Sequence, residues 1–197
     1  MIKKPFVVGI AGGTASGKTT IAANLENALT GYKILVIHMD SYFKPDKDIP
    51  RAKAFVTGKI YADHNHPETM DLNKLNSDLE KIIKNNKRFD IVIVEGLLTL
   101  WDDNICGKLN FKIFVDCRAD ERIVRRLKRN MQWGLSFDEI TDVYLDMVRY
   151  RHEEYAEPSK WRADIIINGS NPTEVSLDVL ATYIKEKIKG ESKACMI

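Results

Sequence analysis

Residues 12–19 read Gly12-Gly13-Thr14-Ala15-Ser16-Gly17-Lys18-Thr19 and match the pattern G-x-x-x-x-G-K-[ST] in full. The apolar run Phe6–Ala11 precedes them, and a helical pattern that begins at Thr19 follows. Glycines let the backbone curl until several N–H groups point at one phosphate, and a helix N-terminus adds positive potential. The sequence therefore predicts a phosphate-binding loop between a buried strand and a helix.

Residues of this loop are expected to divide the work of binding a nucleotide. The predicted nucleotide-binding residues are Gly12, Gly13, Thr14, Ala15, Ser16, Gly17, Lys18, Thr19 and Thr20. Lys18 should reach the β- and γ-phosphates, and Thr19 should bind Mg²⁺ through its hydroxyl. The alternative, a glycine-rich turn with an incidental lysine, is disfavoured by the flanking strand and helix. ATP and Mg²⁺ are the expected cofactors.

Outside the loop, short apolar runs rich in β-branched residues alternate with helical periodicity. The runs are Phe6–Ala11, Ile34–His38, Ile91–Glu95, Lys112–Asp116 and Asp164–Asn168. Strands that are apolar on both sides are typical of a parallel sheet covered by helices on both faces. Ser136 and Glu139 form a capping box, which predicts a helix that should stop before Pro158.

Composition limits the class of protein. The 197 residues are 44% hydrophobic and 29% charged with a net charge of +2, which suits one globular domain. So small a net charge gives no reason to expect nucleic acid as a partner, and no run is apolar and long enough to predict a membrane span. Three scattered cysteines (Cys106, Cys117 and Cys195) favour reduced thiols and a cytoplasmic location.

Two carboxylates follow predicted strands. Glu95 ends one strand and Asp40 comes two residues after another. Because the carboxyl ends of parallel strands meet at one edge, both should lie near the phosphate loop. Glu95 is expected to hold Mg²⁺, and Asp40 to accept a proton from a hydroxyl acceptor or to hold the metal. The alternatives are a solvated strand-end acid for Glu95 and an Asx turn for Asp40.

Two further segments are expected to cover a substrate. Residues 41–70 fit neither the helical nor the strand period, and so long a loop in a compact domain is usually functional. Residues 118–135 carry a basic run, which is either a solvated helix face or a lid. On a lid, Arg126 and Arg129 would neutralise charge on a transferring phosphoryl group.

With these motifs in place, the sequence resembles the uridine kinase family of P-loop nucleoside kinases over most of its length. The matching segments are Gly9 to Lys18, Asp40-Ser41-Tyr42-Phe43-Lys44, Asn65-His66-Pro67-Glu68-Thr69-Met70-Asp71, Glu95-Gly96-Leu97-Leu98, Asn110 to Asp116, Arg125 to Arg129, and Glu157 to Ile167. The linked spacing of these segments is far more specific than the phosphate loop alone.

The resemblance implies ATP-dependent phosphorylation of a ribose 5′-hydroxyl. The residues that it implies for the acceptor are Asp40, Tyr42, Lys44, Asn65 and His66. It makes Asp40 the general base, places Thr19, Asp40 and Glu95 around Mg²⁺, and assigns catalytic roles to Lys18, Arg126 and Arg129. It also places residues 169–171 near adenine.

The sequence departs from the family pattern at three places. Asn65 stands where the family has an aspartate that grips the sugar. The segment 85–90 is too short for the hairpin that uridine kinases place before the third strand. Gln132-Trp133-Gly134-Leu135 replaces Glu-Arg-Gly-Arg, so two arginines are missing. Nicotinamide riboside kinases also lack that hairpin and share a segment like Asp40 to Pro45.

We therefore expect a P-loop NTPase fold, a three-layer α/β/α sandwich with a parallel five-stranded sheet in the order 2-3-1-4-5, as one kinase domain over residues 1–197. The expected function is transfer of the γ-phosphoryl group of ATP to a nucleoside-like small molecule. Open alternatives are another acceptor, such as nicotinamide riboside or a sugar phosphate, and a nucleotide-binding module without turnover. The sequence leaves open whether the chain forms a homo-oligomer.

Overall fold

Five parallel strands form the central sheet of the computed structural model, which describes residues 4–84 and 88–194. The strands are β1 (Phe6–Gly12), β2 (Ile34–His38), β5 (Ile91–Glu95), β6 (Phe111–Asp116) and β7 (Ile165–Asn168). Their order is β2-β5-β1-β6-β7, and every neighbouring pair is parallel. Counted along the chain within this sheet, the order is 2-3-1-4-5, so the predicted topology is confirmed.

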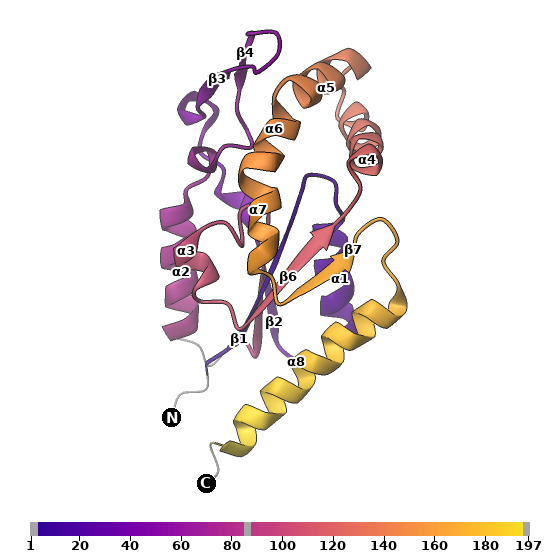
Figure 1. The fold of residues 1–197 in the computed structure, drawn as a ribbon. Coiled ribbons are helices and arrows are strands. Elements are labelled where there is room, and N and C mark those ends of the chain that lie inside the picture. The colour runs from indigo at the N-terminus through magenta and orange to yellow at the C-terminus, as the bar shows by residue number, and fades with distance from the viewer. Residues whose placement is uncertain (1–3, 85–87, 195–197) are drawn as a thin grey trace.

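Helices cover both faces of the sheet, which confirms the three layers (Figure 1). One core lies under α1 (Lys18–Ala28) and α8 (Glu174–Ala194) and takes alternate strand residues such as Val8. The other lies under α2 (Leu72–Lys84) and α3 (Asp103–Cys106) and takes residues such as Val7. Because successive side chains of a strand point to opposite faces, β1 contributes to both cores and is buried throughout.

The segment 41–70 is a closed excursion at the carboxyl edge of the sheet. An antiparallel bridge joins Phe43 to Met70 at its two ends. The structure within it differs from the predicted irregular loop, because β3 (Arg51–Lys53) and β4 (Ile60–Ala62) form a two-stranded hairpin. The short 3₁₀ turns η1 (Met39–Tyr42), η2 (Asp46–Asp48) and η3 (Pro67–Thr69) make up much of the rest. Strands of three residues are too short to show a period of two in the sequence.

A long helix follows the basic helix α4 (Ala119–Gln132). It runs from Phe137 to Arg162 through α5 (Phe137–Val143), η4 (Tyr144–Val148), α6 (Arg149–Arg151), η5 (His152–Ala156), α7 (Glu157–Ser159) and η6 (Lys160–Arg162). The capping box of Ser136 and Glu139 is present. The predicted stop before Pro158 is wrong, because the π-helical turn η5 directly before the proline replaces the α-helical hydrogen-bond pattern that a proline would break.

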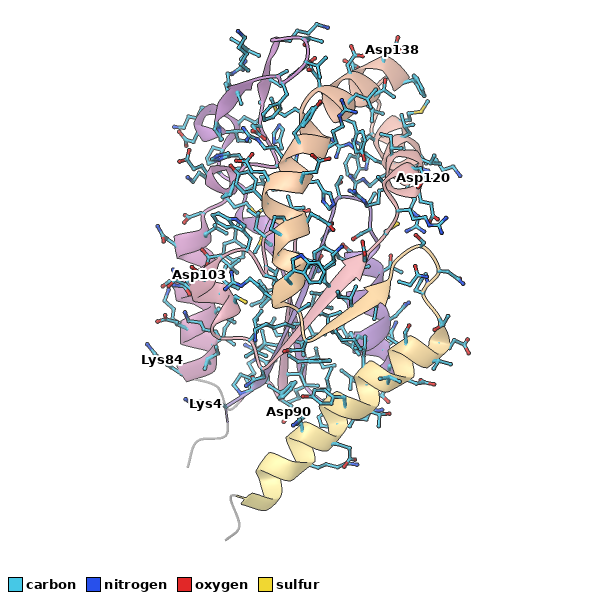
Figure 2. All side chains as sticks on the ribbon, in the orientation of Figure 1. Lys4, Lys84, Asp90, Asp103, Asp120 and Asp138 are labelled. Carbon is cyan, nitrogen blue, oxygen red and sulfur yellow. The ribbon has the colours of Figure 1, made fainter. Side chains whose placement is uncertain are left out.

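The helices α4 and α5 and the hairpin β3–β4 gather at one end of the molecule. Lys4, Lys84 and Asp90 lie toward one end in Figure 2, and Asp138 marks the opposite end, where α4, α5 and the hairpin gather. The predicted absence of a hairpin between residues 85 and 90 falls partly outside the described residues, and the hairpin in the structure comes before α2 instead.

The helices and the cysteines of the described residues bear on the predictions about a membrane span and about disulfides. None of the helices within residues 4–84 and 88–194 combines the length and apolarity that crossing a membrane requires. Cys106 and Cys117 are buried free thiols, and Cys195 lies outside the described residues.

Candidate active site

The phosphate loop leaves β1 and enters α1 through an unusual backbone. Gly17 has a φ of 102°, a conformation that glycine adopts without strain, and Ala15 is held at 59°. Gly13 approaches its neighbours so closely that a Cβ there would lie 2.6 Å from Arg122 Nη1 and 2.9 Å from the His152 ring. The glycines at positions 13 and 17 are therefore required by close approach and by backbone angle respectively.

Lys18 is the first residue of α1 and reaches back across the loop. Its Nζ donates a hydrogen bond to the Gly13 carbonyl oxygen at 3.1 Å. Burial lowers the pKa of its ammonium group, and the negative charges of Glu95 and Asp40 oppose that fall. An ammonium group that has lost much of its hydration gains more from a phosphate placed beside it.

Glu95 ends β5 at the edge of the sheet and is buried. Its Oε1 accepts a hydrogen bond from the Thr19 hydroxyl at 3.2 Å and lies 2.8 Å from His38 Nδ1. His38 is the register partner of Glu95 across the β2–β5 pair, which explains the contact. The predicted metal residues Thr19 and Glu95 are thus in contact, and His38 orients the carboxylate.

Asp40 lies in the 3₁₀ turn η1, just after β2. Partial burial raises the pKa of its carboxyl group, Lys18 opposes that rise, and the like charge of Glu95 adds to it. A carboxylate whose pKa is raised toward neutrality is a better proton acceptor than an ordinary surface aspartate. The Asp40 side chain lies in the same cavity as the phosphate loop.

The basic helix α4 brings two arginines over the loop. Arg126 Nη1 and Arg129 Nη2 donate to the Thr14 hydroxyl at 3.2 and 3.4 Å. Burial, together with the neighbouring charge of Arg129, lowers the pKa of Arg126 to about 10. Burial also lowers the pKa of Arg129, and Asp40 opposes that fall.

A cavity of about 980 Å³ joins these groups. Its lining includes the predicted residues Thr14, Ala15, Ser16, Gly17, Lys18, Thr19, Thr20, Asp40, Asn65, Glu95, Arg126 and Arg129. The predicted residues Gly12 and Gly13 are buried and are not among these lining residues. Three residues predicted to bind the acceptor lie outside this described lining: Tyr42, which donates to Asp78 Oδ2 at 3.4 Å; Lys44; and His66, whose Nδ1 accepts from Glu68 N at 3.2 Å.

Relatives of known sequence decide the family. The uridine kinase of Bacillus mycoides (strain KBAB4) is 33% identical over 204 residues, which cover 92% of this chain and 93% of that protein. The uridine kinase of Bacillus thuringiensis (strain Al Hakam) is 32% identical over a similar span. The model of the phosphoribulokinase/uridine kinase family matches residues 81–176. The chain belongs to the phosphoribulokinase/uridine kinase family.

Solved structures show that the chain also has the fold of this family. The phosphoribulokinase from Rhodobacter spheroides superposes with a TM-score of 0.63 at 16% identity, over 86% of this chain and 74% of that one. A possible uridine kinase from Bacillus stearothermophilus gives 0.53 at 19% identity, over 84% and 89%. A putative fructose transport system kinase from Silicibacter sp. TM1040 gives 0.63 at 16% identity, over 83% and 90%.

The donors around the loop can be tested against the Mg²⁺ that the family implies. The described residues contain no group of three or more His, Cys, Asp or Glu placed to hold a metal by themselves. Two carboxylates and the Thr19 hydroxyl are oxygen donors, and Mg²⁺ in kinases takes few protein ligands beside phosphate and water. The residues present therefore fit Mg²⁺ that arrives with a nucleotide.

Several cavity residues were missed by the sequence-based reasoning. Phe43, His64, Met70, Leu97, Arg125, Trp133, Leu135 and Pro172 also line it, beside Gly169, which the resemblance placed near adenine. Arg125 donates to the carbonyl oxygens of Gly169 and Ser170 at 2.9 and 3.2 Å and so holds the loop after β7. Its position in the basic run was visible, but its direction on the helix was not. Trp133 and Leu135 occupy the positions at which the resemblance predicted arginines, so that wall of the cavity is apolar.

Proposed function

We propose that this chain transfers the γ-phosphoryl group of ATP to a hydroxyl group of a nucleoside, in the manner of a uridine kinase. One observation carries the proposal: a single cavity holds the phosphate loop, a carboxylate with a raised pKa and two arginines from a separate helix. The relatives named uridine kinase support the same reaction class. Retention of Lys18, Thr19, Asp40 and Glu95 together argues against a nucleotide-binding module without turnover.

The residues divide the reaction as follows. The loop N–H groups and Lys18 bind the phosphates, and Arg126 and Arg129 neutralise charge that develops on the transferring group. Asp40 accepts the proton of the acceptor hydroxyl as the oxygen–phosphorus bond forms and the bond between the γ-phosphorus and the bridging oxygen of ADP breaks. When Mg²⁺ is bound, held by Thr19, Asp40 and Glu95, it supplies positive charge to the phosphate oxygens.

Two segments are positioned to exclude water from this reaction. We infer that residues 41–70 cover the acceptor and that residues 118–135 form a lid over the phosphates. His64 and Asn65 of the first segment and Arg126 and Arg129 of the second line the cavity. Closure would prevent water from replacing the acceptor and turning the kinase into an ATPase.

The acceptor half of the cavity favours an uncharged acceptor. His64 precedes Asn65 in the cavity wall, its ring contacts that of Phe43, and Phe43 pairs with Met70. The lining arginines bond elsewhere: Arg126 and Arg129 donate to Thr14, and Arg125 donates to Gly169. A phosphorylated sugar would place a second anion where these residues offer it no cation. An amide accepts a hydroxyl hydrogen bond more weakly than a carboxylate does, so Asn65 would bind a ribose hydroxyl less tightly than an aspartate at this position.

The decisive experiment measures ADP release from ATP in the presence of uridine, cytidine, nicotinamide riboside or a sugar phosphate. Stimulation by a nucleoside supports the proposal. Stimulation by the sugar phosphate alone, or tight ATP binding with no stimulated release, contradicts it.

The buried free thiols Cys106 and Cys117 further support a reducing, cytoplasmic location.

A further inference from the structure

Asp63 is a fully buried carboxylate close to the acceptor half of the cavity. Its Oδ2 accepts a hydrogen bond from Arg151 Nε at 2.6 Å, and its Oδ1 accepts one from the backbone N–H of Asn65 at 3.2 Å. The Asp63 carbonyl oxygen accepts from the Thr69 hydroxyl at 2.6 Å. The carboxylate therefore joins the backbone of a cavity residue to a side chain that lies 88 positions further along the chain.

Aromatic rings and a second carboxylate fix the orientation of the Arg151 side chain. It lies on the long helix, in α6, and its guanidinium group sits 5.3 Å from the Phe55 ring centre and 5.7 Å from that of Tyr155. Its Nη1 donates to Glu154, which is half exposed. A planar guanidinium between two aromatic rings has few alternative orientations, so its Nε direction toward Asp63 is fixed.

The same helix also holds the far end of the hairpin. Asp146, in the π-helical turn η4, accepts hydrogen bonds from the backbone N–H groups of Val56 and Thr57 at 3.0 and 2.9 Å, and from the Thr57 hydroxyl. The backbone N–H of Phe55 donates to the Asp146 carbonyl oxygen at 3.1 Å. The hairpin is thus attached to the long helix at its tip, while Asp63 attaches it at its base. In Figure 1 the hairpin lies beside the upper part of this helix.

The attachment also explains why this aspartate is not itself an acceptor ligand. Both Asp63 oxygens already have donors within the protein, and the residue has no exposed surface. His64 and Asn65, the two residues directly after Asp63, line the cavity. A shift of the Asp63 carboxylate would therefore move the Asn65 backbone directly.

We propose that Asp63 and Arg151 form a buried latch that positions Asn65 for the acceptor, so that both are positioning residues for the reaction. This inference rests on the proposed function, because it names the support of the acceptor half of the same cavity. Since the latch touches neither the phosphate loop nor the lid arginines, it acts on the acceptor and leaves ATP binding alone.

The test compares four variants with the wild-type chain. Arg151→Met removes the charge but keeps an apolar side chain between the two rings, Asp63→Asn removes the other charge, and the double variant removes both. Glu154→Gln is the matched control, because it removes only the exposed partner of Arg151. For each protein, the KM for the acceptor, the Kd for ATP by calorimetry and the melting temperature are measured.

Arg151→Met should raise the acceptor KM about tenfold or more, because small displacements of a positioning group are costly, while the Kd for ATP stays within about twofold. The double variant should regain melting temperature relative to Arg151→Met, since no unpaired charge remains buried, yet keep the raised KM. Glu154→Gln should match the wild type. An unchanged acceptor KM, or a KM and an ATP Kd that rise together, would overturn the latch.

Hydrogen exchange gives a readout that does not need turnover. In Arg151→Met the amides of residues 60–70 should exchange faster, while those of residues 12–20 stay as in the wild type. If Arg151→Met fails to fold, Arg151→Lys tests the same point, because it keeps the charge and loses the planar fork. Should the wild type phosphorylate no acceptor, the proposed function fails, whereas unchanged exchange over residues 60–70 rejects the latch itself.

Discussion

The phosphate half and the acceptor half of the cavity are built in opposite ways. The phosphate half is local: nine consecutive residues, 12–20, supply the loop, and Lys18 bonds to a carbonyl five positions before it. The acceptor half depends on contacts 88 and 90 positions apart, between the segment that carries Asn65 and the long helix. A loop made of consecutive residues keeps its shape when distant parts of the chain change. A site formed by contacts between distant segments changes when the residues that join those segments change.

The two halves of the cavity differ in the part of the substrates that each can recognise. In the proposed reaction the phosphate half binds a chemical group that is the same for every acceptor, and backbone N–H groups suit that task. The acceptor half carries Asn65, at the position where the resemblance to uridine kinases predicted an aspartate. Variants in the two halves should therefore produce separable effects on ATP and on the acceptor.

The largest expected effect is in the phosphate half. Lys18→Ala should lower turnover by about 10⁴-fold, because the ammonium group neutralises charge on the phosphates during transfer. The measurement is ADP release at saturating acceptor. Lys128→Ala, an exposed lysine of α4, is the matched control and should retain wild-type turnover. Near-normal turnover of Lys18→Ala would remove the loop from the reaction.

Asp40→Asn tests the group between the two halves. Turnover should fall about 10³-fold, since an amide cannot accept the hydroxyl proton, and ATP affinity should stay nearly unchanged. Below the raised pKa of Asp40 the wild-type carboxyl is protonated, so wild-type turnover should fall as the pH drops through that value. The variant should lack this acid limb, as judged from kcat measured across pH. Retained turnover would show that Asp40 is not the proton acceptor.

The lid arginines should give a smaller effect. Arg126→Ala should cost about 10²-fold in kcat, because its guanidinium faces Thr14 of the loop and acts on charge that develops during transfer. Its effect on the KM for the acceptor should be slight. Steady-state kinetics with each substrate varied in turn make the comparison. An effect confined to the acceptor KM would instead place Arg126 in the acceptor half.

Asn65→Asp sharpens the comparison from the other side. The change should alter the acceptor KM about tenfold, since a carboxylate binds hydroxyl groups more strongly than an amide, and leave the ATP Kd unchanged. The two constants are measured on the same preparation. Equal changes in both would mean that Asn65 does not lie at the acceptor.

The smallest effect concerns stability behind the phosphate loop. Burial beside Arg122 lowers the pKa of His152, which packs against Gly13, to about 4. The unfolded chain then binds a proton that the folded chain does not, so stability should fall as the pH drops from about 6.5 to about 4, by at most about 3 kcal/mol. Urea unfolding of His152→Gln should show a shallower pH dependence over that range. An identical slope would show that His152 does not titrate as described.

The sequence predicted most of the fold because its signals were local. The five sheet strands were found within one residue at every end, since buried strands are continuous apolar runs, and the capping box located the start of the long helix. The end of that helix was missed, because the π-helical turn that accommodates Pro158 leaves no mark in the residue pattern.

In the candidate site, the sequence predicted the phosphate loop and the strand-end carboxylates. It did not predict the buried residues that hold the acceptor half in place. Asp63 and Arg151 each look like ordinary surface charges when read alone, and only the tertiary structure buries them against each other. Tyr42 and His66 lie outside the described cavity lining, where Tyr42 bonds to Asp78 and His66 to the Glu68 backbone N–H, and their roles toward the acceptor stay a prediction. Direction on a turn is set by long-range packing, which a motif does not record.

The most direct test of the account is mass spectrometry of the products formed from ATP and a nucleoside. The account predicts one phosphorylated nucleoside for each ADP, about 10⁴-fold less product from Lys18→Ala, and a higher acceptor concentration for half-maximal product from Arg151→Met. ADP formed without a phosphorylated nucleoside, or a phosphorylated product that appears equally in Lys18→Ala, would contradict it.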